Sequence, residues 1–99
     1  MNEIERDGII LFVGDGCPAC NVAKPIYHDF FKEQNQEYTM IDAKDEIELA
    51  QMLKIRGIPT LIFFKNDKEF KRIVGVPTKF ILAETFDIWV DKDDFLAFD

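Results

Sequence analysis

The stretch GDGCPACNVAKP, running from Gly14 to Pro25, contains the only two cysteines in the 99 residues of the chain. Cys17 and Cys20 stand three positions apart. On a helix this spacing places two side chains on one face, with Cα atoms roughly 5 to 5.5 Å apart, a distance that a disulfide can bridge. The pair is therefore predicted to cycle between dithiol and disulfide.

The residues around the pair predict different roles for the two thiols. A loop, Gly14-Asp15-Gly16, precedes Cys17, and Pro18 stands where a helix favours proline, at its first position. Unpaired backbone amides and the helix dipole at that end favour a thiolate at Cys17, whereas Cys20 lies one turn further in and is shielded. We expect Cys17 to be the attacking thiol and Cys20 the resolving one.

Two other interpretations of the cysteine pair remain open. The pair could be half of a tetrahedral zinc site, but the chain has no third cysteine and one histidine, His28, so the site would need a second subunit or carboxylates. Alternatively, both thiols could be inert core residues. Gly16 and Pro18 argue against this, because they indicate a strand-to-helix loop at the carboxyl edge of a sheet, where reactive groups tend to lie. We expect no metal and no cofactor.

Hydrophobic periodicity predicts the elements on either side of the loop. The continuous apolar run GIILFV, Gly8–Val13, is typical of a strand buried on both faces of a sheet. A helix is expected over residues 18–34, with a bend at Pro25, which removes one backbone donor. The apolar positions of this helix are Val22, Ile26, Tyr27, Phe30 and Phe31.

The rest of the chain continues with two further helices and three strands. Strands are predicted over residues 37–42, 60–64 and 69–74, and the last two are joined by a turn at 65–68 that suits a hairpin. One helix is predicted over residues 45–54, and a final one begins at Pro77. Their apolar positions are Ile47, Leu49, Ala50 and Leu53 in the first, and Phe80, Ile81, Ala83 and Phe86 in the second.

Composition limits the classes of function. With 47% hydrophobic and 13% aromatic residues, the chain can form one domain with a substantial core. No run approaches the roughly 18 to 20 apolar residues of a membrane span, and the beginning MNEIERDG lacks the features of a secretory signal, so a cytoplasmic location is expected. The net charge of -7 repels phosphate backbones, which argues against a nucleic-acid partner.

Taken together, these motifs resemble the thioredoxin family. The Cys-x-x-Cys pair follows the first central strand, and Pro25, eight residues beyond Cys17, matches the helix-kinking proline of that family. The segment ELAQMLKIRGIPTLIFFKNDKEFKRIVG, residues 48–75, is similar to the family's third-helix-to-hairpin segment, with Ile58-Pro59-Thr60 at the start of a strand and Gly75 at the end of the hairpin.

The resemblance implies an α/β fold with a central mixed four-stranded sheet flanked by helices. It covers roughly residues 8–88 in one consistent order. We therefore expect a single domain over residues 1–99, with its core at about 8–88. Residues 89–99, WVDKDDFLAFD, would form an acidic and aromatic C-terminal extension.

The resemblance also implies a site and an activity. The Ile58–Pro59 bond should be cis and face the two cysteines, where it prevents metal binding and lets the backbone of Ile58 pair with an extended substrate peptide. Without the cysteine motif, a trans proline opening an edge strand would be favoured. The expected substrate-binding residues are Gly16, Pro18, Ile58, Pro59 and Gly75.

By the same resemblance, the expected activity is reduction of protein disulfides by a monomeric thiol:disulfide oxidoreductase. The thiolate of Cys17 attacks the substrate disulfide, and Cys20 resolves the mixed disulfide. The partners are disulfide-containing proteins and a thioredoxin reductase as electron donor, with no nucleic acid and no membrane.

The chain departs from the family at several positions. Gly16 replaces the usual tryptophan before the first cysteine, and Pro18-Ala19 replaces Gly-Pro. Leu11 occupies the position of a buried aspartate that helps to deprotonate the resolving thiol in many thioredoxins. The lysine that accompanies this aspartate is also missing, since its position falls at Tyr38 or Met40. The absence of both the aspartate and the lysine is self-consistent, because a buried charge left without its partner would be energetically costly.

Proton transfer at Cys20 therefore needs another route. We expect water or a nearby carboxylate such as Asp15 to take part. His28 lies eight residues beyond Cys20, about 12 Å along the helix axis, and is expected on the surface. Lys24, one turn after Cys20, is expected on a solvated helix face.

Two rival functions are also compatible with the residues. A glutaredoxin-like reductase recycled by glutathione is favoured by Pro18-Ala19, but the Ile58-Pro59-Thr60 context and the lack of a Gly-Gly pair after the hairpin argue against it. The second rival function is that of a thioredoxin-fold binding subunit whose redox chemistry is incidental. The tail at 89–99 could serve that role as an interaction segment, or it could pack on the core of its own domain.

Overall fold

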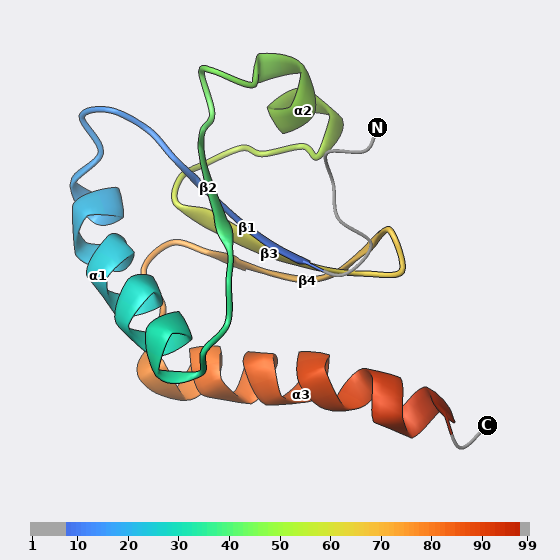
Figure 1. The fold of residues 1–99 in the computed structure, drawn as a ribbon. Helices are drawn as coiled ribbons and strands as arrows, with labels where there is room; N and C mark the ends of the chain where they lie inside the picture. Colours follow the sequence, from blue (N-terminus) through green and yellow to red (C-terminus); the bar gives the residue numbers. More distant parts are fainter. Residues whose placement is uncertain (1–7, 98–99) are drawn as a thin grey trace.

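The computed structural model of the chain describes residues 8–97, with side chains over residues 8–91. Helices and strands alternate along the chain before a final hairpin and helix (Figure 1). The elements are β1 (Gly8–Val13), α1 (Pro18–Glu33), β2 (Thr39–Asp42), α2 (Ile47–Met52), β3 (Thr60–Lys65), β4 (Lys68–Val74) and α3 (Lys79–Ala97). No helix among the described residues has both the length and the apolar character needed to cross a membrane.

The strands form a four-stranded mixed sheet in the order β2-β1-β3-β4. β1 runs parallel to β2 and antiparallel to β3, and β3 pairs with β4 as an antiparallel hairpin. Figure 1 shows α2 on one side of the sheet and α1 and α3 on the other. The predicted fold class, a mixed four-stranded sheet flanked by helices, is confirmed.

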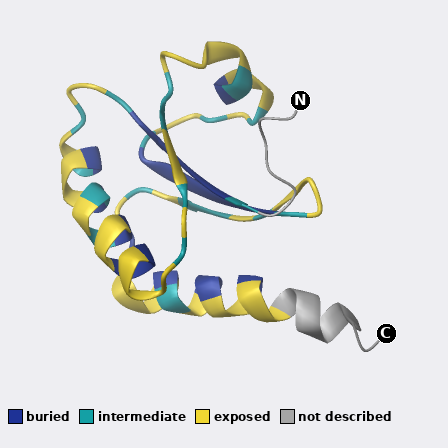
Figure 2. Ribbon diagram, in the orientation of Figure 1, coloured by how far each residue is buried: buried dark blue, intermediate teal, exposed yellow. Residues whose placement is uncertain are grey.

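The two central strands are buried on both faces, as the apolar run in β1 predicts (Figure 2). Side chains alternate between the faces of a strand, so each strand supplies two separate layers of the core. The layer toward α1 and α3 contains Ile9, Leu11, Val13, Leu61 and Phe63. The layer toward α2 contains Ile10, Phe12, Ile62 and Phe64.

Helix α1 begins at Pro18 as predicted and is continuous through Pro25. Its buried residues are Cys20, Ala23, Tyr27, Phe30 and Phe31. Val22 was expected in this set, but it is 54% exposed. The buried stripe follows the 20-23-27-30-31 spacing, and position 22 is turned roughly 100° away from position 23.

Helix α2 is shorter than the predicted 45–54. Asp45 remains outside it, because the Asp42 side chain accepts a hydrogen bond from the Lys44 amide and organises a turn there. At the other end, Lys54 has a left-handed φ of 58°, which ends the helix. Ile47 was expected on the apolar side but is 55% exposed, whereas Ala50 is buried and Leu49 and Leu53 pack against the sheet.

Helix α3 begins two residues later than expected and turns a different side toward the core. The Thr78 hydroxyl accepts a hydrogen bond from the Ile81 amide and caps the helix, which then starts at Lys79 rather than at Pro77. The predicted apolar positions Phe80 and Ile81 are wrong, since they are 72% and 43% exposed. The buried stripe is Leu82, Thr85, Phe86 and Trp89.

Trp89 closes the core at the end of the described side chains. It is 5% exposed, and its indole Nε1 donates a hydrogen bond of 2.9 Å to the carbonyl oxygen of Phe64. The Lys65 ammonium lies 4.5 Å from the centre of the indole ring. The first residue of the predicted extension is thus part of the domain core, and the side chains of residues 92–99 lie outside the described residues.

Candidate active site

The cysteines lie where β1 passes into α1. The loop residue Gly16 has a φ of 63°, a conformation that glycine adopts without strain, and Cys17 follows as the N-cap of α1 with extended backbone. The Sγ of Cys17 accepts a hydrogen bond of 3.1 Å from the backbone amide of Cys20. This sulfur therefore lies among the unpaired amides of the first helical turn, which favour negative charge.

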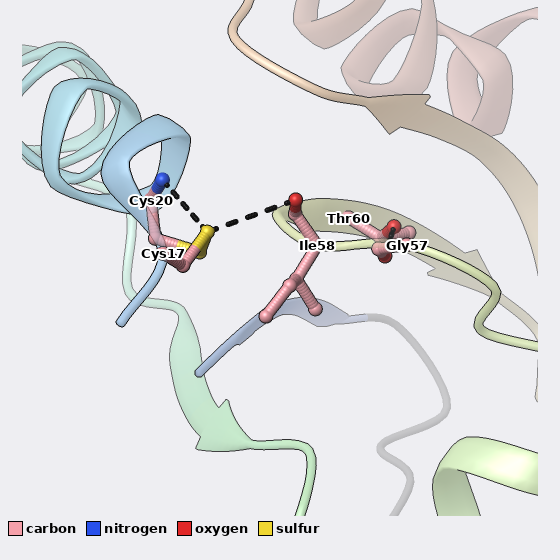
Figure 3. The surroundings of a disulfide bond; sticks show 5 residues. All are labelled: Cys17, Cys20, Gly57, Ile58 and Thr60. Atoms are coloured by element: carbon pink, nitrogen blue, oxygen red, sulfur yellow. Dashed lines mark hydrogen bonds between the residues drawn. A yellow bond between two sulfur atoms is a disulfide. The ribbon is translucent and has the colours of Figure 1, made fainter. Parts of the chain in front are cut away.

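Cys17 and Cys20 form a disulfide, with their Cα atoms 5.2 Å apart (Figure 3). The two sulfur atoms differ in access. Cys17 is partly exposed, whereas Cys20 lies on the inner side of α1 and is fully buried in the core. A large substrate can therefore meet Cys17 but not Cys20.

Ile58 faces the disulfide from the loop before β3, and the Ile58–Pro59 peptide bond is cis. The carbonyl oxygen of Ile58 lies 3.8 Å from the Sγ of Cys17. Figure 3 shows the two atoms facing each other. In the disulfide this sulfur carries no proton, so the two atoms are only in contact. The Cys17 thiol of the reduced protein has a proton that it can donate to this oxygen.

Hydrogen bonds hold the backbone around Pro59 on both sides. The Gly75 amide donates to the carbonyl oxygen of Pro59 at 2.8 Å, and the buried Thr60 hydroxyl donates to the carbonyl oxygen of Gly57 at 2.7 Å. Gly75 has a φ of 89°, which suits glycine. The structure thus brings Gly16, Pro18, Ile58, Pro59 and Gly75 to the same end of the sheet as the cysteines.

Gly14 is a site residue that the sequence analysis left unexplained. A Cβ at this position would lie 2.6 Å from the Cδ1 of Ile58, so the absent side chain leaves room for the side chain of Ile58. The sequence offered only a weak signal for this contact, a glycine in a loop, because its partner is far away along the chain.

Asp15 lies in an ion pair on the surface of the site. Its carboxylate contacts the Lys44 ammonium, which also lies 3.7 Å from Asp42. The hydrogen bond from Lys44 holds the pKa of the Asp15 carboxyl below its usual value. Because Asp15 is paired with Lys44 and mostly exposed, the structure does not favour it as the base for the buried Cys20.

The positions of the missing aspartate and lysine carry uncharged side chains in the structure. Leu11 is fully buried beneath α1, Tyr38 packs against Phe31 with ring centres 5.1 Å apart, and Met40 is 51% exposed. His28 is exposed, and its Nδ1 lies 3.5 Å from the Tyr38 hydroxyl rather than near the cysteines. Within the described part of the chain, no three histidine, cysteine or carboxylate side chains gather as a metal site would require.

Comparison with known proteins agrees with this geometry. The family model for thioredoxin matches residues 1–87. The chain belongs to the thioredoxin family. Thioredoxin H4-2 of Oryza sativa subsp. japonica is 33% identical to it over 79 residues, which are 76% of this chain and 60% of that protein. The Arabidopsis thaliana NADPH-dependent thioredoxin reductase 3 is 31% identical over 80 residues, which are 79% of this chain and 15% of that protein.

This thioredoxin-family chain therefore spans less than two thirds of either relative. Among solved structures, the N21Q mutant thioredoxin from Halobacterium salinarum NRC-1 superimposes with a TM-score of 0.76 at 21% identity, covering 86% of this chain and 75% of that one. At this level of identity the similarity supports the fold, and it agrees with the mixed sheet and helices described above.

Proposed function

We propose that this protein is a thiol:disulfide oxidoreductase that reduces protein disulfides through the Cys17–Cys20 pair. The observation that carries the proposal is the asymmetry of the pair. Cys17 is accessible, receives the Cys20 amide hydrogen bond and faces the Ile58 carbonyl, whereas Cys20 is fully buried behind it. Membership of the thioredoxin family supports the same activity.

The chemistry is a double exchange in which two electrons pass from the protein to the substrate. The Cys17 thiolate attacks one sulfur of the substrate disulfide, an S–S bond forms to Cys17, and the other substrate sulfur leaves and is protonated. Cys20 then loses its proton and attacks the Sγ of Cys17, which releases the second substrate thiol. The Cys17–Cys20 disulfide remains, and an external dithiol or reductase must reduce it.

The Cys20 amide supports the first step. Its hydrogen bond to the Cys17 sulfur, together with the dipole of the 16-residue helix α1, stabilises a thiolate more than a thiol. For the second step, Leu11 supplies no base and Asp15 is held by Lys44, so we assign the proton of Cys20 to water.

Substrate is proposed to bind along Gly16, Pro18, Ile58, Pro59 and Gly75. The backbone of Ile58 would pair with an extended peptide on either side of its disulfide. Val74 and Val76, next to Gly75, are 64% and 44% exposed, and they offer apolar contact at the rim.

The proposed setting follows from the family and the charge. A thioredoxin reductase is the proposed electron donor, in agreement with the similarity to a part of a plant protein named as one. The net charge of -7 disfavours nucleic acid. We further propose a monomer that acts in the cytoplasm on disulfide-containing proteins, without a membrane partner.

The first experiment is insulin reduction with dithiothreitol as electron source, comparing the wild type with Cys17→Ser and Cys20→Ser. We expect both variants to be inactive, but only Cys20→Ser should accumulate a mixed disulfide with insulin, because Cys17 can still attack. Equal trapping by the two variants would contradict the assigned roles, and an inactive wild type would contradict the function.

The reduction potential of the pair separates the possible electron donors. Equilibration of the protein against dithiol buffers should give a value near that of thioredoxins, about -270 mV, if a thioredoxin reductase is the donor. A value near -200 mV would instead favour coupling to glutathione.

A further inference from the structure

A β-bulge in the hairpin places two opposite charges on one face of β4. Phe64 pairs with Glu69 and Phe63 pairs with Lys71, so Phe70 is the extra residue. The bulge shifts the alternation of side chains, and Glu69 and Arg72 both come to lie on the face that carries α2. Their strand partners, Phe64 and Ile62, belong to the core layer on that face.

Arg72 uses this position to join Glu69 to the end of α2. Its guanidinium donates to both carboxylate oxygens of Glu69, at 2.6 and 2.7 Å. The same group donates to the carbonyl oxygen of Leu53 at 2.7 Å and approaches that of Lys54 at 3.5 Å. The fork of the guanidinium satisfies an acid on one side and helix-end carbonyls on the other.

Arg72 is the charged attachment at the end of α2, where Leu53 and Ile55 also pack against the sheet and the Ile55 amide donates to the carbonyl oxygen of Ala50. The helix has six residues, its buried residue is Ala50, and its N-cap Glu46 makes no side-chain capping bond to any described residue. Lys54 then turns the chain through a left-handed conformation. A helix of this length depends on tertiary contacts for its position, and Arg72 supplies a charged one.

Beyond Lys54, four residues lead to the cis bond at Ile58–Pro59. Strand β4 and the residue after it hold this segment at both ends. Arg72 of β4 contacts the Leu53 carbonyl, and the Gly75 amide donates to the Pro59 carbonyl. The Ile58 carbonyl lies between these two attachments and faces the Cys17 sulfur.

We propose that Arg72, held in place by Glu69, is a positioning residue that sets where Ile58 presents its backbone to a protein substrate. The inference rests on the proposed function, in which that backbone pairs with the substrate peptide. It predicts a selective effect. Peptides that pair with Ile58 depend on Arg72, whereas a small disulfide that touches only the Cys17 sulfur does not.

The test compares Arg72→Met with Lys71→Met in single-turnover reactions of the reduced protein. Lys71 is the exposed neighbour whose strand partner, Phe63, belongs to the opposite core layer, so its replacement removes the same charge without touching α2. We expect Arg72→Met to raise the half-saturating insulin concentration about three- to tenfold, with the limiting rate changed less than about twofold. The rate with dithiobis(nitrobenzoate) should be unchanged, and Lys71→Met should match the wild type in both reactions.

Two further variants keep the test independent of folding defects. Arg72→Lys keeps the charge and one donor and should restore part of the loss. Glu69→Gln removes the carboxylate that fixes the Arg72 guanidinium but keeps Arg72 itself. It should weaken insulin binding less than Arg72→Met does. An unchanged half-saturating concentration in Arg72→Met would overturn the proposal, and so would equal losses with insulin and with the small disulfide.

Amide hydrogen exchange tests the attachment without any enzyme assay. In Arg72→Met the amides of residues 54–58 should exchange faster than in the wild type, while those of β1 stay unchanged. If wild-type protein fails to reduce insulin, the proposed function fails, but this exchange pattern still reports on the attachment. Unchanged exchange over 54–58 would remove the physical basis of the proposal.

Discussion

The Cδ1 of Ile58 lies against Gly14, at a point where a Cβ would approach it to 2.6 Å. The contact joins the loop before Cys17 to the loop before Pro59, two segments that meet only in the folded chain. Because Ile58 also faces the Cys17 sulfur, any group placed on Gly14 displaces a residue of the proposed binding edge.

Gly14→Ala should therefore weaken protein-substrate binding at little cost in stability. The new methyl forces Ile58 out of its rotamer, which costs about 1 kcal/mol, and the reduced freedom of the unfolded chain offsets part of this. Insulin kinetics and urea unfolding measure the two effects. In Gly14→Ala/Ile58→Val the Cδ1 is absent, so substrate binding should recover relative to the single variant. If substrate binding does not recover, the clash with the Cδ1 of Ile58 is not the cause of the weaker binding in Gly14→Ala.

Tyr27→Phe should stabilise the protein. The Tyr27 hydroxyl is buried and has no hydrogen-bond partner among the described residues. Its removal should raise the free energy of unfolding by about 1 kcal/mol, since an unsatisfied buried hydroxyl is unfavourable. Urea unfolding at neutral pH measures this change, and a clear loss of stability would indicate a partner that the hydroxyl acquires in solution.

Ionisation of Tyr27 should also make the stabilities of the wild type and Tyr27→Phe differ at alkaline pH. Burial raises the pKa of Tyr27 above its ordinary value of 10.0, so the folded state holds the proton more tightly than the unfolded state. The stability due to this shift is fully present below about pH 10 and is lost as the pH rises toward the higher folded pKa. Wild type should thus lose more stability than Tyr27→Phe between pH 9 and 11, on the order of 1 kcal/mol. Parallel losses in the two proteins would contradict the prediction.

Acid should weaken the Glu69–Arg72 pair. The hydrogen bond from Arg72 lowers the pKa of the Glu69 carboxyl, so the stabilisation is present above its unfolded value of about 4.5 and is lost as the pH falls through the lower folded pKa. Because both side chains are partly exposed, we expect less than about 1 kcal/mol. Urea unfolding of the wild type and Glu69→Gln at pH 6 and at pH 3 should show a larger difference at pH 6.

Truncation of two phenylalanines of α3 should change stability by very different amounts. Phe86 is 7% exposed and contacts Phe30 with ring centres 5.4 Å apart, so Phe86→Ala should cost about 3 to 5 kcal/mol in urea unfolding. Phe80 is 72% exposed, and Phe80→Ala should change stability by less than about 0.5 kcal/mol. Similar losses in the two variants would mean that the helix turns a different side to the sheet.

Local sequence was sufficient for the features that depend on backbone chemistry and on near neighbours. The strand Gly8–Val13, the start of α1 at Pro18 and the 5.2 Å separation of the Cys17 and Cys20 Cα atoms all agree with the predictions. Each follows from a constraint within a few residues, namely β-branched apolar runs, the fixed φ of proline and the pitch of a helix.

Tertiary structure decided which side of each helix is buried and which distant residues meet. Exposed positions of α3 also carry large apolar side chains, among them Phe80 and Ile81, so the apolar pattern alone did not identify the buried side. The choice came from the aromatic residues of α1 and from the Phe64 carbonyl that receives the Trp89 indole. The contacts of Arg72 with Leu53 and of Ile58 with Gly14 likewise join segments far apart in sequence, and such pairings exist only once the sheet has assembled.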